Sequence, residues 1–161
     1  MKPQRIISLL PSATEIVCAL GGEHLLVGRS HECDYPEEIR ELPVCTRPRI
    51  NSNAGSAEID RQVKDKLRQA LSIYEVDEAR IRELKPHLII TQAQCEVCAV
   101  SLDEVKQAVQ SWTNLKPEIL SLSPQRLAQV WDNIREVGRA MELGDEGREV
   151  QFLHTVAAHL R

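Results

Sequence analysis

Short apolar runs alternate with longer amphipathic segments along the chain, and this alternation restricts the fold more than any other feature. The apolar runs predict strands over 5–10, 25–28, 44–46, 88–91 and 119–122. The segments between them repeat apolar residues at helical spacing, most regularly at Ile59, Val63, Leu67 and Leu71. Strands that alternate with helices are typical of a parallel sheet covered by helices on both faces. The sequence therefore predicts an α/β fold with a mostly parallel sheet.

Capping motifs mark where the helices are expected to begin. Residues 12–15 (SATE) and 101–104 (SLDE) have the form of capping boxes, in which a serine and a later glutamate satisfy backbone amides. Asp77 is the expected N-cap of a short helix that ends before Pro86. Ser123, followed by proline at the first helical position, is the expected N-cap of a long helix.

Composition and charge exclude several classes of protein. The chain has 161 residues, a net charge of −4 and only 3% aromatic residues, and it has no basic cluster. Phosphates and bases would find few partners, so nucleic acid is not expected to bind. No apolar run approaches the ~18 residues that would indicate a spanning helix, so membrane insertion is not expected. One domain is expected at this length.

The first twenty residues superficially resemble a signal peptide but are interrupted by polar residues. Pro11, Ser12, Thr14 and Glu15 fall inside the apolar stretch that runs to Leu20. A strand and a helix explain the pattern better. The expected location is therefore cytoplasmic for the chain as written, and periplasmic or otherwise extracytoplasmic if a leader had been removed.

Two cysteine-bearing loops follow predicted strands. His31 and Cys33 come after the second strand, and Cys95 and Cys98 follow the strand at 88–91. Carboxyl ends of parallel strands share one edge of the sheet, so these side chains could form a Cys₃His site for zinc or iron. A redox pair, a disulfide between Cys95 and Cys98, and simple packing remain as alternatives.

The fingerprints of common enzymes are missing from the sequence. No glycine-rich dinucleotide or phosphate loop, no G-x-S-x-G and no H-E-x-x-H is present. The chain is therefore not expected to be an enzyme.

Three motifs in order resemble a known family. Residues 5–15 (RIISLLPSATE), 34–36 (DYP) and 80–90 (RIRELKPHLII) look like the N-terminal lobe of the helical-backbone, class III substrate-binding proteins of ABC importers. The similarity is closest to the vitamin B12-binding branch, whose relatives carry iron-siderophores and haem. It extends from about residue 5 to the end of the chain, apart from 51–74, which looks like an insertion.

The resemblance implies a three-layer, Rossmann-like lobe over residues 1–143, with 144–161 as the start of a long inter-lobe backbone helix and the second lobe absent from this chain. The ligand would be a small-molecule metal chelate, a corrinoid or haem-like compound, held between two lobes. The matching ligand-binding residues would be Pro11, Ser12, Ala13, Thr14, His31, Glu32, Tyr35, Gln92 and Gln94.

The chain departs from the family pattern at positions that matter for function. The aromatic residues that press on the corrin in the B12-binding branch are replaced by Glu32 and Gln92. The acidic residue with which the family docks on its permease corresponds to Ala79, so docking on an ABC permease is doubtful.

Two functions follow from these observations. The first is a solute-binding lobe of ABC-importer type that binds a corrinoid or a similar metal chelate. The alternative is a cytoplasmic metal- or thiol-dependent protein that uses His31, Cys33, Cys95 and Cys98. The apolar stripe of Val150, Leu153, Val156 and Leu160 also predicts a homodimer of this chain.

Overall fold

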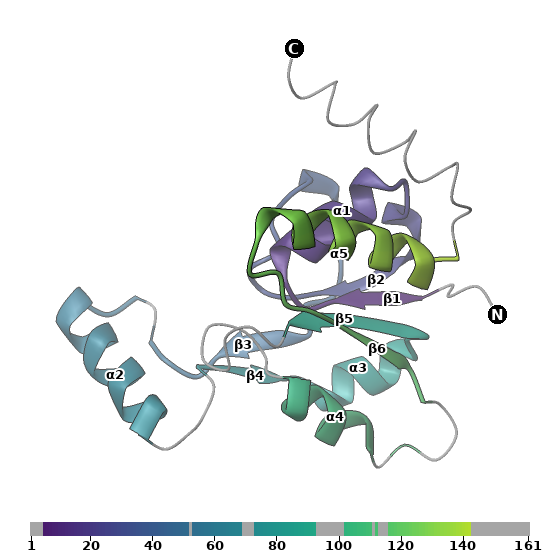
Figure 1. The fold of residues 1–161 in the computed structure, drawn as a ribbon. Helices are drawn as coiled ribbons and strands as arrows, with labels where there is room; N and C mark the ends of the chain where they lie inside the picture. The colour runs from purple at the N-terminus through teal and green to yellow at the C-terminus, as the bar shows by residue number, and fades with distance from the viewer. Residues whose placement is uncertain are drawn as a thin grey trace.

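Four short strands form a parallel sheet in the spatial order β2, β1, β5, β6 (Figure 1). The computed structural model describes residues 5–51, 53–68, 73–92, 102–110, 112 and 116–142. β1 (Ile6–Ser8) and β5 (Leu88–Gln92) lie in the middle of the sheet, between β2 (Leu26–Arg29) and β6 (Glu118–Leu122). All neighbouring strands are parallel, so their carboxyl ends lie at one edge, which we call the carboxyl edge.

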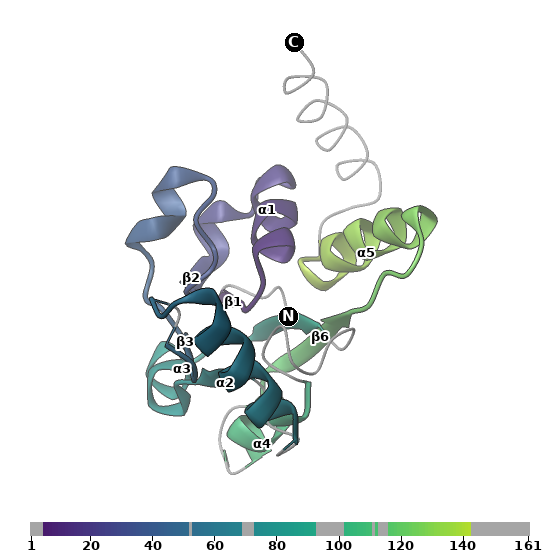
Figure 2. The ribbon, with the colours of Figure 1, turned by 90° about the vertical axis from the view of Figure 1, so that its left-hand side faces the viewer.

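Helices cover both faces of this sheet and give the three-layer arrangement that the sequence predicts. α1 (Pro11–Ala19) and α5 (Leu127–Ala140) pack on one face and contact each other. α3 (Glu78–Leu84) and α4 (Leu102–Gln110) pack on the other face (Figure 1, Figure 2). Two short 3₁₀ helices, Glu23–Leu25 and Glu37–Glu41, precede and follow β2.

The central strands supply apolar side chains to both layers of the core. Ile6 and Ile90 pack against α1 and α5, whereas Ile7 and Ile89 pack toward α3 and α4, and all four are fully buried. Strands that are buried on both faces have continuous apolar sequences rather than alternating ones. The predicted strands at 5–10, 25–28, 88–91 and 119–122 are accordingly confirmed as β1, β2, β5 and β6.

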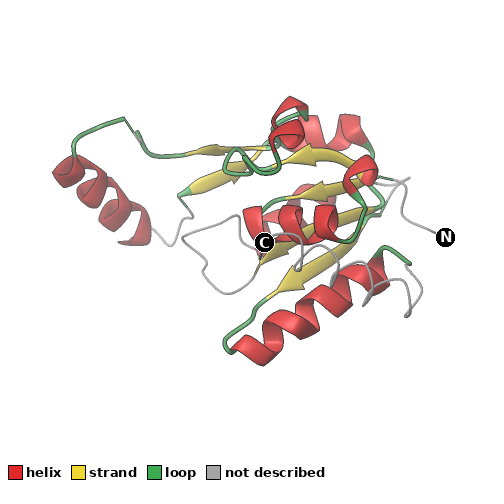
Figure 3. Ribbon diagram, turned by 90° about the horizontal axis from the view of Figure 1, so that it is seen from above, coloured by secondary structure: helices red, strands yellow, loops and turns green. Residues whose placement is uncertain are grey.

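A second, smaller sheet is antiparallel and carries an arm. β3 (Thr46–Pro48) pairs with β4 (Tyr74–Val76), and α2 (Ser56–Arg68) lies between them in the sequence. Figure 3 shows α2 at the far end of this arm, beyond the carboxyl edge of the main sheet. The expected helix around Ile59 and Val63 is thus confirmed. That the segment 51–74 is an insertion stays a prediction.

One predicted strand is displaced and another was missed. The expected strand at 44–46 is wrong in position: Val44 makes only a single bridge to Arg29, and the strand begins at Thr46. The reason is that β2 ends at Arg29, so the chain beyond residue 45 finds its partner in β4 instead. β4 is only three residues long and gave no periodic signal.

Two predicted helix starts are wrong and one is right. α1 begins at Pro11 with Leu10 as its N-cap, because proline at the first helical position already has the required φ, so Ser12 lies inside the helix. α5 begins at Leu127, not after Ser123: Gln129 Oε1 accepts from the backbone nitrogens of residues 125 and 126, at 2.7 and 3.1 Å. Asp77 does cap α3, and its Oδ1 accepts from Arg80 N at 2.9 Å.

Several expectations fall on residues that the structure does not describe. They are the capping residue Ser101, the segment 144–161 with its apolar stripe, and the loop that carries Gln94, Cys95 and Cys98. Within the described ranges, no helix combines the length and the apolar character needed to cross a membrane.

Candidate ligand-binding site

Backbone hydrogen bonds bring the loops after β1 and β2 together at the carboxyl edge. Ser30 N donates to Ser8 O at 2.9 Å, which continues the pairing of the two strands past their ends. Leu9 N donates to Ile90 O at 2.9 Å and ties the β1 loop to β5. The segments 9–14 and 30–36 therefore leave the sheet side by side, at the edge where α/β sheets bind ligands.

A buried hydroxyl cluster joins these loops beneath the surface. Thr14 Oγ1 lies 2.9 Å from Ser8 Oγ and 3.1 Å from Cys33 Sγ. Thr14 is fully buried and Cys33 is 1% exposed. Burial raises the pKa of the Cys33 thiol, so the protonated form is favoured. Cys33 therefore serves in this structure as a small packed thiol with a hydroxyl partner.

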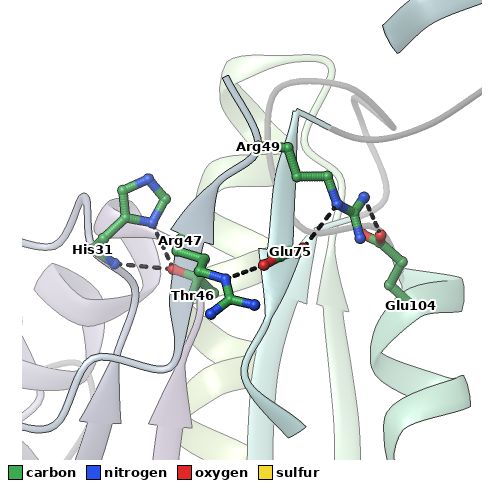
Figure 4. Close-up of polar contacts among 6 residues, drawn as sticks. All are labelled: His31, Thr46, Arg47, Arg49, Glu75 and Glu104. Atoms are coloured by element: carbon green, nitrogen blue, oxygen red, sulfur yellow. Dashed lines mark hydrogen bonds and ion pairs between the residues drawn. The ribbon is translucent and has the colours of Figure 1, made fainter. Parts of the chain in front are cut away.

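His31 is held by a second hydroxyl, that of Thr46 (Figure 4). Thr46 Oγ1 accepts from His31 N at 3.0 Å and lies 2.7 Å from His31 Nδ1 and 3.1 Å from Ser30 Oγ. Burial lowers the pKa of His31, which keeps the imidazole neutral at neutral pH. The ring is thus fixed through Nδ1. Among the described residues, none is a partner of Nε2.

Tyr74 joins this cluster from the second sheet. Its ring meets the ring of His31 edge to face, with centroids 4.8 Å apart and planes at 67°. Its hydroxyl donates to Glu32 Oε1. Burial and the hydrogen bond to Glu32 raise the pKa of Tyr74 to about 12, so the phenol keeps its proton. Sequence analysis missed this residue because its contacts depend on the pairing of β3 with β4, which no local pattern predicts.

Arg29 fixes the shape of the loop that carries His31 and Glu32. Its Nη1 donates to the carbonyl oxygens of Ser30 and Cys33, at 3.1 and 3.0 Å. Its Nη2 donates to Arg40 O at 2.9 Å. The Arg29 guanidinium therefore holds both ends of the loop in place. Tyr35, which lies in this loop, is 52% exposed.

Beside the His31–Thr46 pair, a row of ion pairs runs from Arg47 across the second sheet to Glu104 of α4 (Figure 4). Arg47 and Arg49 both contact Glu75, with Arg49 Nε 3.4 Å from Glu75 Oε2. Arg49 Nη1 also lies 2.7 Å from Glu104 Oε1. Arg47 above all, and Arg49 with it, lower the pKa of Glu75. The row fastens the base of the arm to the main body.

The predicted ligand-binding residues differ in accessibility. Ser12, Glu32 and Tyr35 are exposed, and Pro11, His31 and Gln92 are partly buried. Ala13 and Thr14 are fully buried, so in this structure they support the α1 turn from beneath. Gln94 lies outside the described residues.

The structure describes two of the four predicted metal ligands. Cys95 and Cys98 lie outside the described residues, and His31 and Cys33 have separate hydroxyl partners in Thr46 and Thr14. Among the described residues no group of three or more histidine, cysteine, aspartate or glutamate side chains could hold a metal ion. The site of His31, Cys33, Cys95 and Cys98 therefore stays a prediction.

A hollow of about 430 Å³ lies at the opposite, amino-terminal edge of the sheet. It is lined by side chains from the starts of β5 and β6 and from the end of α5, among them His87, Glu118 and Arg139. This hollow is separate from the loops of the carboxyl edge.

Comparison with solved structures shows which known proteins have a similar fold. No family model matches the chain, and no curated protein matches it by sequence. Among solved structures, it is similar to the periplasmic vitamin B12-binding protein BtuF of Vibrio cholerae, with a TM-score of 0.62 and 23% identity. The match covers 97% of this chain and 48% of that one.

Two further structures give the same result. A periplasmic heme-binding protein from Pseudomonas aeruginosa matches with a TM-score of 0.61 and 22% identity, over 94% of this chain and 43% of its own. An ABC transporter substrate-binding protein from Listeria monocytogenes matches with a TM-score of 0.59 and 17% identity, over 97% and 46%. The chain spans about half the length of these structures, which are of binding proteins and not of enzymes, as the sequence led us to expect. The resemblance found in the sequence is thus confirmed at the level of the fold, which is that of one lobe of an ABC-type substrate-binding protein.

Proposed function

We propose that this chain is a solute-binding lobe of ABC-importer type and that it binds a metal-chelate macrocycle, a corrinoid or haem-like compound, at the carboxyl edge. The observation that carries the proposal is the match of nearly the whole chain to part of a vitamin B12-binding protein and of a heme-binding protein. Of the two locations left open by the sequence, the periplasmic or extracytoplasmic one agrees with the names of these structures. We also propose that the protein works with an ABC permease.

The chemistry of the carboxyl edge supports a ligand of this kind. His31 is partly buried, neutral and fixed through Nδ1. When Nδ1 carries the proton and donates to Thr46, the Nε2 lone pair is left for another partner. The metal at the centre of a chelate could use it as an axial ligand. Tyr35, exposed in the same loop, offers an aromatic surface to the macrocycle.

The proposal includes a second lobe opposite the carboxyl edge, since the chain covers 43–48% of the three binding proteins described above. Small-molecule sites bury ~70–90% of the ligand surface, and one lobe offers about half of that. Residues 1–161 alone are therefore expected to bind cobalamin weakly, with a dissociation constant above about 1 μM.

Absorbance titration of the protein with cobalamin and with haem tests the proposal. We expect a saturable spectral change with at least one of the two, weakened in His31→Ala and retained in His24→Ala, which removes an exposed histidine on another element. No saturable binding of either compound at millimolar concentration would contradict the proposal. Metal analysis of the same samples tests the separate prediction of a zinc or iron site.

A further inference from the structure

Glu32 is an exposed carboxylate whose position is fixed from two sides. Its backbone nitrogen donates to Ser30 Oγ at 3.3 Å, which holds the turn after β2. Its side chain accepts from the Tyr74 hydroxyl through Oε1. An exposed glutamate without such contacts would sample many rotamers, whereas this one is presented at the carboxyl edge in a defined place.

The Tyr74 contact leaves Glu32 with unused acceptor capacity. A phenol has one proton to donate, and an ionised carboxylate has about four acceptor positions on two oxygens. Oε1 receives the Tyr74 proton, so Oε2 remains available to a ligand. Because the carboxylate can only accept, it favours N–H or O–H donors and cations and repels another carboxylate.

Three arginines of this region have direct partners other than Glu32. Arg47 and Arg49 are paired with Glu75 and, for Arg49, also with Glu104. Arg29 donates through both terminal nitrogens to backbone carbonyls. Among the described residues, none forms an ion pair with Glu32. Glu32 therefore presents a carboxylate without an ion-pair partner among the described residues, close to His31.

From this geometry we propose that Glu32, positioned by Tyr74, determines ligand specificity by favouring macrocycles whose periphery carries amide N–H donors over macrocycles that carry carboxylates. This inference rests on the proposed function and narrows it. It favours an amidated corrinoid over haem, whose propionates would meet the Glu32 carboxylate. It also gives the second sheet a role at the site, since β4 supplies the tyrosine that holds the selecting group.

A pair of probes that share one macrocycle tests the inference. Cobinamide carries peripheral amides, and cobyrinic acid has carboxylates in their place. We expect the wild-type protein to bind cobinamide about tenfold or more tightly, as measured by calorimetry at pH 7.5 in 0.15 M salt. Glu32→Gln should remove most of this preference. Tyr74→Phe should reduce it while the net charge of the protein stays the same.

Glu83→Gln is the matched control, because it makes the same charge change at an exposed position on α3 and should keep the preference. Glu32 is exposed, so Glu32→Gln should fold normally, which thermal melting checks. Equal binding of the two probes by wild type, or an unchanged preference in Glu32→Gln, would overturn this inference and leave the proposed function standing. Binding of haem with no binding of either corrin probe would overturn this inference alone, whereas no binding of haem or of either probe at millimolar concentration would overturn both.

Discussion

Two buried threonine hydroxyls hold the candidate ligand loops in place. Thr14 is fully buried and Thr46 is 4% exposed, and each contacts a residue of the loop after β2. Buried hydroxyls are costly unless they are hydrogen-bonded, and here both are. At the scale of single residues, the geometry of His31 and Cys33 therefore depends on these two partners from other elements.

Loss of the Thr46 hydroxyl should destabilise the protein. Thr46→Val keeps the shape but leaves the His31 backbone N–H without its acceptor and the His31 ring without its hydrogen-bond partner, so we expect the free energy of unfolding to fall by about 1–3 kcal/mol. Urea denaturation measures the change. Thr46→Ser retains the hydroxyl and should lose less. A Thr46→Val variant as stable as wild type, with the loss confined to Thr46→Ser, would show that packing of the methyl group, and not the hydrogen bonds, stabilises this position.

The burial of His31 predicts a dependence of stability on pH. The pKa of His31 is lowered from 6.5 in the folded protein, so below that pH the unfolded chain binds more protons than the folded one. The contribution of His31 to stability is thus complete above about pH 6.5 and is lost as the pH falls toward the folded-state pKa. We expect wild type to lose more stability than His31→Asn between pH 7.5 and 5.5. Parallel pH profiles would refute this.

Sequence reasoning identified His31 and Cys33 as chemically informative but not their partners. The H-x-C pattern after a strand is local, so it could be recognised from the sequence. The partners, Thr14, Thr46 and Tyr74, lie 15 or more positions away in the sequence, in contacts made only in the folded protein. No periodicity in the sequence encodes such contacts.

At the scale of elements, close packing of β2 against its neighbours sets the position of the ligand loop. Gly28 lies in β2, and a Cβ atom there would come within 2.7 Å of Cys45 Sγ and 2.8 Å of Leu84 Cδ1. These side chains belong to the layer that contains α3, so the absence of a side chain at position 28 allows the close approach.

Gly28→Ala should therefore destabilise the protein through overpacking. We expect a loss of about 1–3 kcal/mol in the free energy of unfolding, measured by chemical denaturation. Gly55→Ala is the control, because a Cβ atom at that position would meet nothing within 4 Å, and it should change stability by less than about 0.5 kcal/mol. A Gly28→Ala variant as stable as Gly55→Ala would contradict the packing of β2 described above.

Elements with strong local signals were predicted well and those that depend on distant partners were not. The buried strand β5 and the helix α3, with its Asp77 cap, follow from apolar pattern and capping chemistry. β4 forms only because β3 lies beside it. The start of α5 depends on Gln129, whose side chain accepts hydrogen bonds from the backbone nitrogens of residues 125 and 126. The Ser-Pro pair at 123–124 instead predicted a start that is too early.

At the scale of the whole molecule, the candidate ligand-binding residues gather at one edge of the main sheet. The chain matches about half the length of the binding proteins it resembles, and His31, Glu32 and Tyr74 gather at the carboxyl edge of its sheet. The three-layer fold was predictable from the alternation of strands and helices. The helix α2 of the arm was also predicted, but the second sheet and its tyrosine were not, because β3 and β4 form only when they pair with each other.

The central claim is that ligand binds at this carboxyl edge, and NMR of the ¹⁵N-labelled protein titrated with cobalamin tests it most directly, since the method also detects weak binding. We predict that the largest shifts fall on the backbone amides of His31, Glu32 and Tyr74. Amides at the opposite edge, around His87 and Glu118, should stay unchanged. Shifts concentrated at that opposite edge, or no shifts with cobalamin and none with haem at millimolar concentration, would contradict binding at the carboxyl edge.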